Sequence, residues 1–265
     1  AEDEFPGRGP GALIGMADRL DTIAGYVGLG ITPTGSEDPF GLRRSARGLF
    51  GTLRANGYRV ELSTLVGEAL RLLRGKVPQN GERLKAEILD FLRTRLHHLF
   101  LGEGYRYDLV DAVLSARSDE VVEAEGRLRA LSALSREEGF EALTTTFKRV
   151  VNIIHQSGML SKEDFGGELS RSFPVEPSLL LEPTERELYE LIEENRGAIE
   201  ESFAREGWEE ALGRVAGLRK TVDKFFDDVL VMAPEERLRK NRLNLLATIG
   251  AFFTRIADFT RIVPG

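Results

Sequence analysis

The spacing of the apolar residues is the feature that most limits how this chain can fold. Apolar side chains recur at steps of three and four, as at Leu13, Met16, Leu20 and Ile23, through most of the sequence. This period places them along one side of an α-helix, and no stretch shows the alternation typical of a half-buried strand. We therefore expect an all-α protein, a helical bundle in two lobes.

The same pattern gives approximate helix limits. It predicts helices over 11–27, 38–56, 62–74, 82–101 and 105–117, a helix that starts behind Ser118, a helix that starts behind Ser135 and runs to about 155, and helices over 184–205, 208–218, 221–232 and from 234 onward. Asp38 is expected to cap the second helix, because its carboxylate can accept from free N–H groups. Capping boxes are expected where Ser135 precedes Glu138 and where Thr184 precedes Glu187.

Glycine and proline interrupt the helical pattern between 156 and 183. A connector of this length is unusual inside a compact domain. We expect it to pack across a neighbouring surface through its four large apolar side chains, Leu160, Phe165, Leu169 and Phe173.

Composition excludes several classes of protein. Hydrophobic residues make up 42% of the 265 residues, which is enough for a sizeable core, and there is no cysteine. Disulfides, a thiolate nucleophile and cysteine-ligated zinc are therefore excluded. The net charge of −7 excludes a uniformly basic protein that wraps nucleic acid.

The charges are nevertheless segregated along the chain. Lys and Arg outnumber Asp and Glu by 13 to 6 over 43–106 and by 6 to 3 over 232–265, whereas 182–210 holds 3 Arg and 11 Glu. Either the basic parts face a polyanion, or all these stretches are solvated helix faces.

The sequence predicts a cytoplasmic protein with no membrane partner. No apolar run approaches ~18 residues, the length that spans a bilayer. The first residues have neither the basic nor the apolar region of a signal peptide, and the lack of cysteine fits a reducing compartment.

Candidate metal ligands are few. His97 and His98 are adjacent on a helix and point ~100° apart, so they cannot easily share an ion, and no carboxylate pair stands near His155. Asp18 and Asp21 lie three apart on one helix face and could bind a divalent ion. No histidine precedes Asp18, so a complete phosphohydrolase metal site is absent; we expect a buried Asp18, a solvated Asp21 and no metal or catalytic residue.

Two clusters combine basic and amide side chains. Lys148 and Asn152 lie four apart on one helix face with Arg149 beside them, and a second group opens the last helix, namely Arg237, Arg239, Lys240, Asn241 and Arg242. Lys and Arg bind phosphates, and Arg and Asn hydrogen-bond the edges of unstacked RNA bases. Cations at a helix start are disfavoured by the helix dipole, so this clustering needs an explanation. Pairing with Glu235, Glu236 or other carboxylates is the alternative.

At these residues the sequence resembles a known family, the β subunit of bacterial-type heterotetrameric glycyl-tRNA synthetase, in its C-terminal part. The resemblance covers nearly the whole chain, and its most specific block runs from Pro33 to Arg44. The matching stretches occur in family order, at 17–22, 33–36, 38–44, 148–153, 222–232 and 238–243.

The resemblance implies two domains. Residues 1–75 resemble the C-terminal part of an HD-like helical domain, and residues 76–265, with a core at about 138–262, resemble the helical anticodon-binding region (DALR type) shared with arginyl-tRNA synthetases. Only Leu238 and Arg239 of the sequence Glu236-Arg237-Leu238-Arg239 match the tetrapeptide that names this domain.

The resemblance also implies a function within a glycine–tRNA ligase. In the family the α subunit activates glycine with ATP and Mg²⁺, and the β subunit binds tRNA. This chain is then expected to position tRNA(Gly) through its anticodon arm, to contact the α subunit and the other β-subunit domains, and to hold no catalytic site, cofactor or DNA of its own. The expected tRNA-binding residues are Lys148, Arg149, Asn152, Arg239, Lys240, Asn241 and Arg242. The alternative is a helical interaction or scaffold module of the synthetase with little RNA contact.

Overall fold

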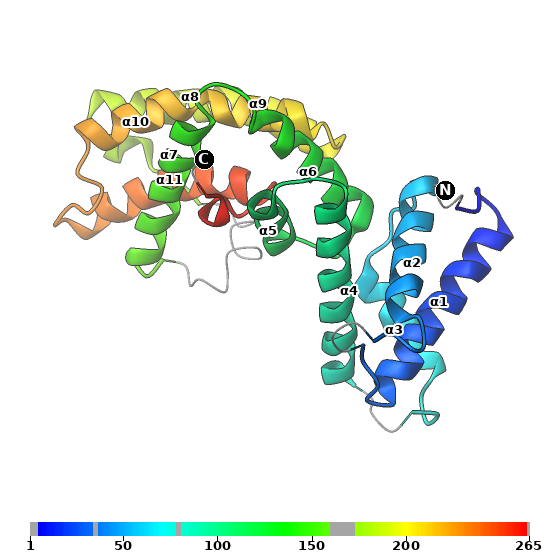
Figure 1. Ribbon diagram of the computed structural model, residues 1–265. Helices are drawn as coiled ribbons and strands as arrows, with labels where there is room; N and C mark the ends of the chain where they lie inside the picture. The colour runs from blue at the N-terminus through cyan, green and yellow to red at the C-terminus, as the bar shows by residue number, and fades with distance from the viewer. Residues whose placement is uncertain (1–4, 34–36, 78–80, 160–172, 264–265) are drawn as a thin grey trace. The chain divides into compact units, whose positions relative to one another are not determined.

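A computed structural model describes residues 5–33, 37–77, 81–159 and 173–263 (Figure 1). Across these ranges the regular elements are helices, and the only strand-like pairing is an isolated bridge between Glu61 and Glu120. The all-α fold class is therefore confirmed. No helix within these ranges has both the length and the apolar character needed to cross a membrane.

The chain forms two compact units. Unit 1 comprises Ala1–Tyr105 with Ser118–Glu125, and unit 2 comprises Arg106–Arg117 with Gly126–Gly265. The division expected from the resemblance, 1–75 and 76–265, concerns family domains and stays a prediction. The first boundary between the compact units lies after Tyr105 rather than after 75, because the helix over 82–102 packs against the helices that precede it.

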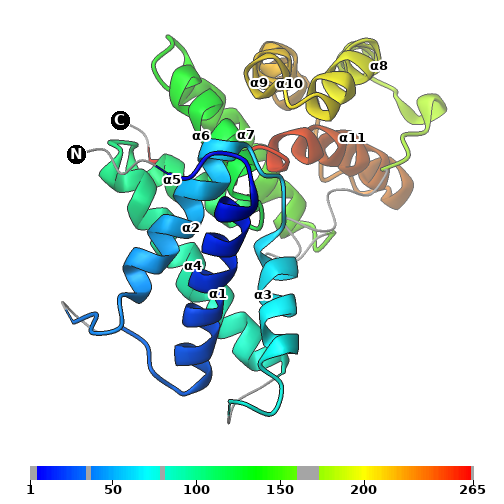
Figure 2. The same cartoon turned by 90° about the vertical axis from the view of Figure 1, so that its right-hand side faces the viewer.

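Unit 1 is built on four helices, α1 (Pro10–Gly28), α2 (Leu42–Asn56), α3 (Leu62–Leu72) and α4 (Glu82–Gly102). Helix α1 packs against α2, α3 and α4, and all four lie side by side in Figure 2. Their apolar positions at helical spacing form the core: Ile23, Leu49, Val66, Leu92 and Leu96 are all buried.

Carboxylates outside the helices satisfy two helix starts in unit 1. Asp38 accepts from the N–H groups of Leu42 (2.8 Å) and Arg43 (3.0 Å), the first of α2, as expected, but this helix begins at Leu42 behind Gly41 rather than at 38. Asp119 accepts from the N–H of Ser63 at the start of α3 (2.8 Å). Because Asp119 is engaged there, Glu120 accepts the first N–H groups of α6 (Val121–Leu134), and Ser118 does not cap that helix as expected.

Unit 2 is organised around one buried helix. It holds α5 (Tyr107–Ala116), the greater part of α6, α7 (Phe140–Gln156), α8 (Pro183–Ala204), α9 (Trp208–Gly217), α10 (Arg219–Asp228), α11 (Glu236–Thr254) and two short 3₁₀ turns, Pro177–Leu179 and Phe259–Arg261. Helix α11 packs against α7, α8 and α9, and every residue from 241 to 250 is buried.

Two expected helix starts in unit 2 are wrong. Helix α7 starts behind Gly139 without a side-chain cap, and the Ser135 hydroxyl instead donates to the Ser132 carbonyl. The capping box of α8 consists of Glu182 and Glu185 rather than Thr184 and Glu187. The Thr184 hydroxyl is not available, because it donates to Asp228 (2.6 Å).

Helix α10 ends at Asp228, four residues before its expected end at 232. Residues 229–235 then form a loop that leads into α11. Of the connector expected to pack through four apolar side chains, Leu160, Phe165 and Leu169 lie outside the described residues, and Phe173 is half-buried.

Candidate nucleic-acid interface

Helix α7 has one buried face and one polar face. Val150, Val151 and Ile154 are buried, whereas Arg149 and Asn152 are exposed and Lys148 is half-buried. The i to i+4 relation of Lys148 and Asn152 therefore places them at the edge of an accessible polar surface, as the spacing predicts.

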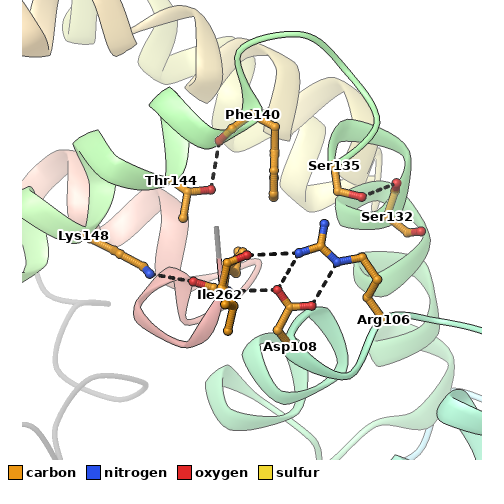
Figure 3. Close-up of polar contacts among 9 residues, drawn as sticks. Arg106, Asp108, Ser132, Ser135, Phe140, Thr144, Lys148 and Ile262 are labelled. Atoms are coloured by element: carbon orange, nitrogen blue, oxygen red, sulfur yellow. Dashed lines mark hydrogen bonds and ion pairs between the residues drawn. The ribbon is translucent and has the colours of Figure 1, made fainter. Parts of the chain in front are cut away.

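Lys148 is already engaged within unit 2. Its ammonium group donates to the Ile262 carbonyl (2.6 Å), as Figure 3 shows. Ile262 is buried, so this bond helps to hold the C-terminal segment against α7. Lys148 therefore holds that segment in place, and its half-buried side chain is only partly accessible to a ligand.

A second clamp holds the same segment and was not found from the sequence. Buried Asp108 accepts from the Val263 N–H (2.9 Å) and from the Arg106 guanidinium (2.7 Å), and Arg106 also donates to the Val263 carbonyl (3.1 Å; Figure 3). A cleft of about 400 Å³ adjoins the clamp, lined also by Glu137 and Glu141. Because Arg106 is neutralised by Asp108 and two glutamates face the same space, this cleft does not suit an anion.

Arg149 is the most accessible of the expected RNA-contacting cations on α7. Its guanidinium lies 4.2 Å from the centre of the Phe226 ring of α10. This cation–π contact restrains the side chain, which is still exposed to solvent. Asn152 lies three residues further on, and within the described part of the chain its side-chain amide has no hydrogen bond.

A carboxylate on the neighbouring surface of α10 already has hydrogen-bond partners within unit 2. Asp223 accepts from the Thr146 hydroxyl of α7 (2.5 Å) and from Arg219 (2.9 Å). These contacts join α10 to α7 and use both oxygens of that carboxylate. The polar face that remains for a ligand is centred on Arg149 and Asn152.

The structure contradicts the expectation that Asn241 is accessible. Its amide accepts from the Glu176 N–H (2.7 Å) and donates to the Glu176 carbonyl (3.1 Å), while Asn244 donates to the Pro174 carbonyl (2.6 Å). Both asparagines are buried because α11 lies at the centre of unit 2. Their side chains hold residues 174–176 against α11 by bonding backbone N–H and carbonyl groups of that segment.

Arg242 is also buried, in an ion pair. Its Nε lies 2.6 Å from the Glu185 carboxylate of α8, with the two side chains 7% and 0% exposed. A second nitrogen donates to the Leu230 carbonyl (2.8 Å). Arg242 therefore joins α8, α11 and the 229–235 loop, and an RNA ligand has no access to it.

The remaining cations of α11 lie nearer to solvent. Arg239 is half-buried and donates to the Ala233 carbonyl (2.9 Å), and Lys240 is exposed with no ion pair among the described residues. Arg237 pairs with Glu176 (3.2 Å). The alternative explanation for this cluster was pairing with carboxylates. It holds for Arg237 and Arg242, which pair with Glu176 and Glu185 rather than with Glu235 or Glu236.

The two predicted clusters have different contacts within unit 2. The α7 group contacts α10 and the C-terminal segment, whereas the α11 group contacts the start of α8, residues 174–176 and the 229–235 loop. No hydrogen bond or ion pair within the described ranges joins one group to the other. Burial of Asn241 and Arg242 removes two members of the α11 group from any recognition surface, and Arg239 and Lys240 are its more accessible expected members.

The metal-site expectations have a mixed outcome. Asp21 is exposed as expected, but Asp18 is exposed rather than buried, because Met16, Leu20 and Ile23 define the inner face of α1. Within the described residues no three His, Asp or Glu side chains are grouped to hold a metal ion.

Comparison with known proteins places these features in a class. Residues 143–260, which include α7 and α11, match the family model described as "DALR anticodon binding domain". Unit 2 therefore contains a helical domain of the anticodon-binding class. Residues 1–115 match a second family model, described as "Glycyl-tRNA synthetase beta subunit".

Individual relatives agree with both matches. The chain is 41% identical to the glycine–tRNA ligase beta subunit of Myxococcus xanthus over 268 residues, which cover 99% of this chain and 37% of that protein. It is 38% identical to the corresponding protein of Moorella thermoacetica over 267 residues, 100% of this chain and 37% of that protein. The chain belongs to the glycyl-tRNA synthetase β-subunit family, and it spans little more than a third of the length of these relatives.

Proposed function

We propose that this chain binds tRNA(Gly) through the anticodon arm and positions it for attachment of glycine by an α subunit. The observation that carries the proposal is the coincidence of the anticodon-binding-domain match with unit 2 and with the exposed Arg149–Asn152 surface of α7. ATP and Mg²⁺ would then be used by the α subunit, and the protein would act in the cytoplasm.

The proposed mechanism is positioning rather than chemistry. Arg149 is restrained by Phe226 and is still exposed to solvent, which suits stacking on an unstacked base or a bidentate bond to a phosphate. Asn152 is within a helical turn of it and offers an amide donor and acceptor to a base edge. Lys148, Arg239 and Lys240 add positive charge at the border of unit 2's accessible surface, where backbone phosphates would bind.

The burial of Asn241 and Arg242 changes which variants can test the proposal. Replacing either one removes fold contacts, so a loss of RNA binding would not identify an RNA contact. Arg149→Ala is the informative change, because its side chain is exposed. Arg214→Ala is the matched control: it removes one exposed arginine of unit 2, on α9, that pairs with Glu210.

The test is a titration of the protein with an isolated anticodon-arm hairpin of tRNA(Gly) at several salt concentrations. Arg149→Ala should weaken binding and reduce the salt slope by about 0.7–0.9, the value of one phosphate contact, if the contact is to a phosphate. Arg214→Ala should change neither quantity. Equal affinity of wild type and Arg149→Ala for the hairpin would remove the α7 surface from the proposal.

A scaffold role is the second candidate. Three apolar side chains around the start of α8 and in the 229–235 loop are well exposed, Leu181 (54%), Leu230 (69%) and Met232 (47%). Such side chains suit a protein partner such as the α subunit or another β-subunit domain. This candidate predicts that the chain alone has no measurable affinity for the hairpin but binds the α subunit.

A further inference from the structure

Unit 1 carries a cluster of arginines that is not part of the α7 surface of unit 2. An open cleft of about 910 Å³ between α1, α2 and the segment before α2 is lined by Arg19, Arg43, Arg44 and Arg47, against two carboxylates, Asp18 and Asp38. Asp38 is already used to cap α2. The cleft therefore carries an excess of positive charge.

The fold makes room for the innermost of these arginines. Arg19 donates to the Gly15 carbonyl (2.7 Å), and its side chain crosses Gly48 of α2 so closely that a Cβ there would collide with the guanidinium. The absence of a side chain at Gly48 thus lets Arg19 lie between the two helices. Its position is set by packing rather than by an acidic partner.

The other three arginines stand at an unfavourable end of a helix. Arg43, Arg44 and Arg47 lie in the first two turns of α2, whose first turn contains no acidic residue. The positive end of the helix dipole repels cations at this position.

Helix α4 brings further positive charge to the same place. Burial and the neighbouring Arg43 lower the pKa of Arg95. Burial, Arg95, His97 and Arg43 together lower the pKa of His98, because burial and the positive groups around Arg43 disfavour a charged imidazole there. Within the described residues, Arg19 and Arg44 form no ion pair that would offset this repulsion.

We propose that this cleft binds phosphate groups, with Arg19 and Arg44 as direct ligands and with Arg43, Arg47 and Arg95 adding to the positive electrostatic potential. Each guanidinium suits a phosphate group because its planar N–H donors match two phosphate oxygens. The phosphates belong either to an RNA backbone or to a free di- or polyphosphate, since both present the same oxygens. The site lies in unit 1, so it does not depend on the α7 surface.

The test compares two double variants of the 265-residue chain. Arg44→Gln with Arg47→Gln removes two exposed arginines of the cleft, and Arg71→Gln with Arg83→Gln removes two exposed arginines of the same unit outside it. Both leave the same net charge. A thermal melt checks that each still folds; if the cleft double does not, Arg44→Gln alone replaces it, with Arg83→Gln as control.

Two probes distinguish the sources of phosphate, a loop-free RNA duplex and inorganic pyrophosphate, each titrated by calorimetry. The cleft double should bind about tenfold more weakly than the control double to at least one probe. Loss of duplex binding alone assigns the site to RNA, and loss of pyrophosphate binding assigns it to a free phosphate compound. If wild type binds neither probe, or both doubles lose affinity equally, the cleft is not a phosphate site. Because neither probe has an anticodon loop, the outcome does not depend on the proposed function of unit 2.

Discussion

At the scale of single residues, burial separates side chains that look alike in the sequence. Asn152 and Asn241 each stand close to basic residues on a helix, and both were expected to contact RNA. Asn152 is exposed on α7, whereas Asn241 is 4% exposed and binds both backbone groups of Glu176. The first is available to a ligand, and the second holds the fold together.

This difference predicts opposite results for two identical substitutions. Asn241→Ala should lower the free energy of unfolding by about 1–3 kcal/mol, because it leaves a backbone donor and acceptor of Glu176 without partners. Asn152→Ala should leave stability unchanged and weaken binding of the anticodon-arm hairpin. Urea unfolding and the hairpin titration check both, and a stable Asn241→Ala protein would contradict the structural role.

Arg242 and Glu185 give a second prediction at this scale. Arg242→Ala strands a fully buried carboxylate and should cost about 3–5 kcal/mol of stability. Arg242→Met combined with Glu185→Gln should recover most of that loss, because Gln still accepts from the Glu182 N–H that Glu185 satisfies (2.7 Å). Urea unfolding of both variants decides this: a double variant as unstable as Arg242→Ala would mean that the ion pair itself is needed.

At the scale of helices, the apolar period predicted the elements well and their ends less well. Asp38 accepts from the first N–H groups of α2 as expected, although this helix begins at Leu42 rather than at 38, whereas Ser118, Ser135 and Thr184 failed as caps. Competition from distant groups, such as Asp228 for Thr184, cannot be read from local sequence. The complete burial of residues 241–250 of α11 was missed for the same reason, since its polar residues Asn241 and Arg242 are satisfied by the segment at 174–176 and by α8.

Arg127 shows how one such contact links several elements of unit 2. It is 1% exposed and donates from α6 to the Ile256 carbonyl beyond α11 (3.1 Å) and to carbonyls at the end of α5, those of Val113 and Arg117. A cation is favoured at the carbonyl end of a helix.

Arg127→Met should therefore destabilise the protein by about 3 kcal/mol, since several carbonyls lose a charged donor. Arg129→Ala, which removes an exposed arginine two residues further along α6, is the control and should have little effect. Guanidinium unfolding measures both variants. Equal midpoints for the two would show that water replaces Arg127 at these carbonyls.

At the scale of the whole molecule, the chain carries two separate accumulations of accessible positive charge on an acidic protein. One is the arginine cleft of unit 1, and the other is the α7 surface of unit 2. The sequence revealed the second, because Lys148, Arg149 and Asn152 lie within one helical turn. It did not reveal the first, because Arg19 joins the arginines of α2 only through packing against Gly48.

Binding of two full-length tRNA(Gly) molecules, one with its natural anticodon and one with the three anticodon bases replaced, tests the central claim most directly. If unit 2 reads the anticodon, the replaced tRNA should bind at least about tenfold more weakly at the same salt concentration, with each mismatched base costing ~1–3 kcal/mol as in other base-specific contacts. Equal affinity for the two molecules would contradict the account, because the chain would then hold tRNA by its backbone alone.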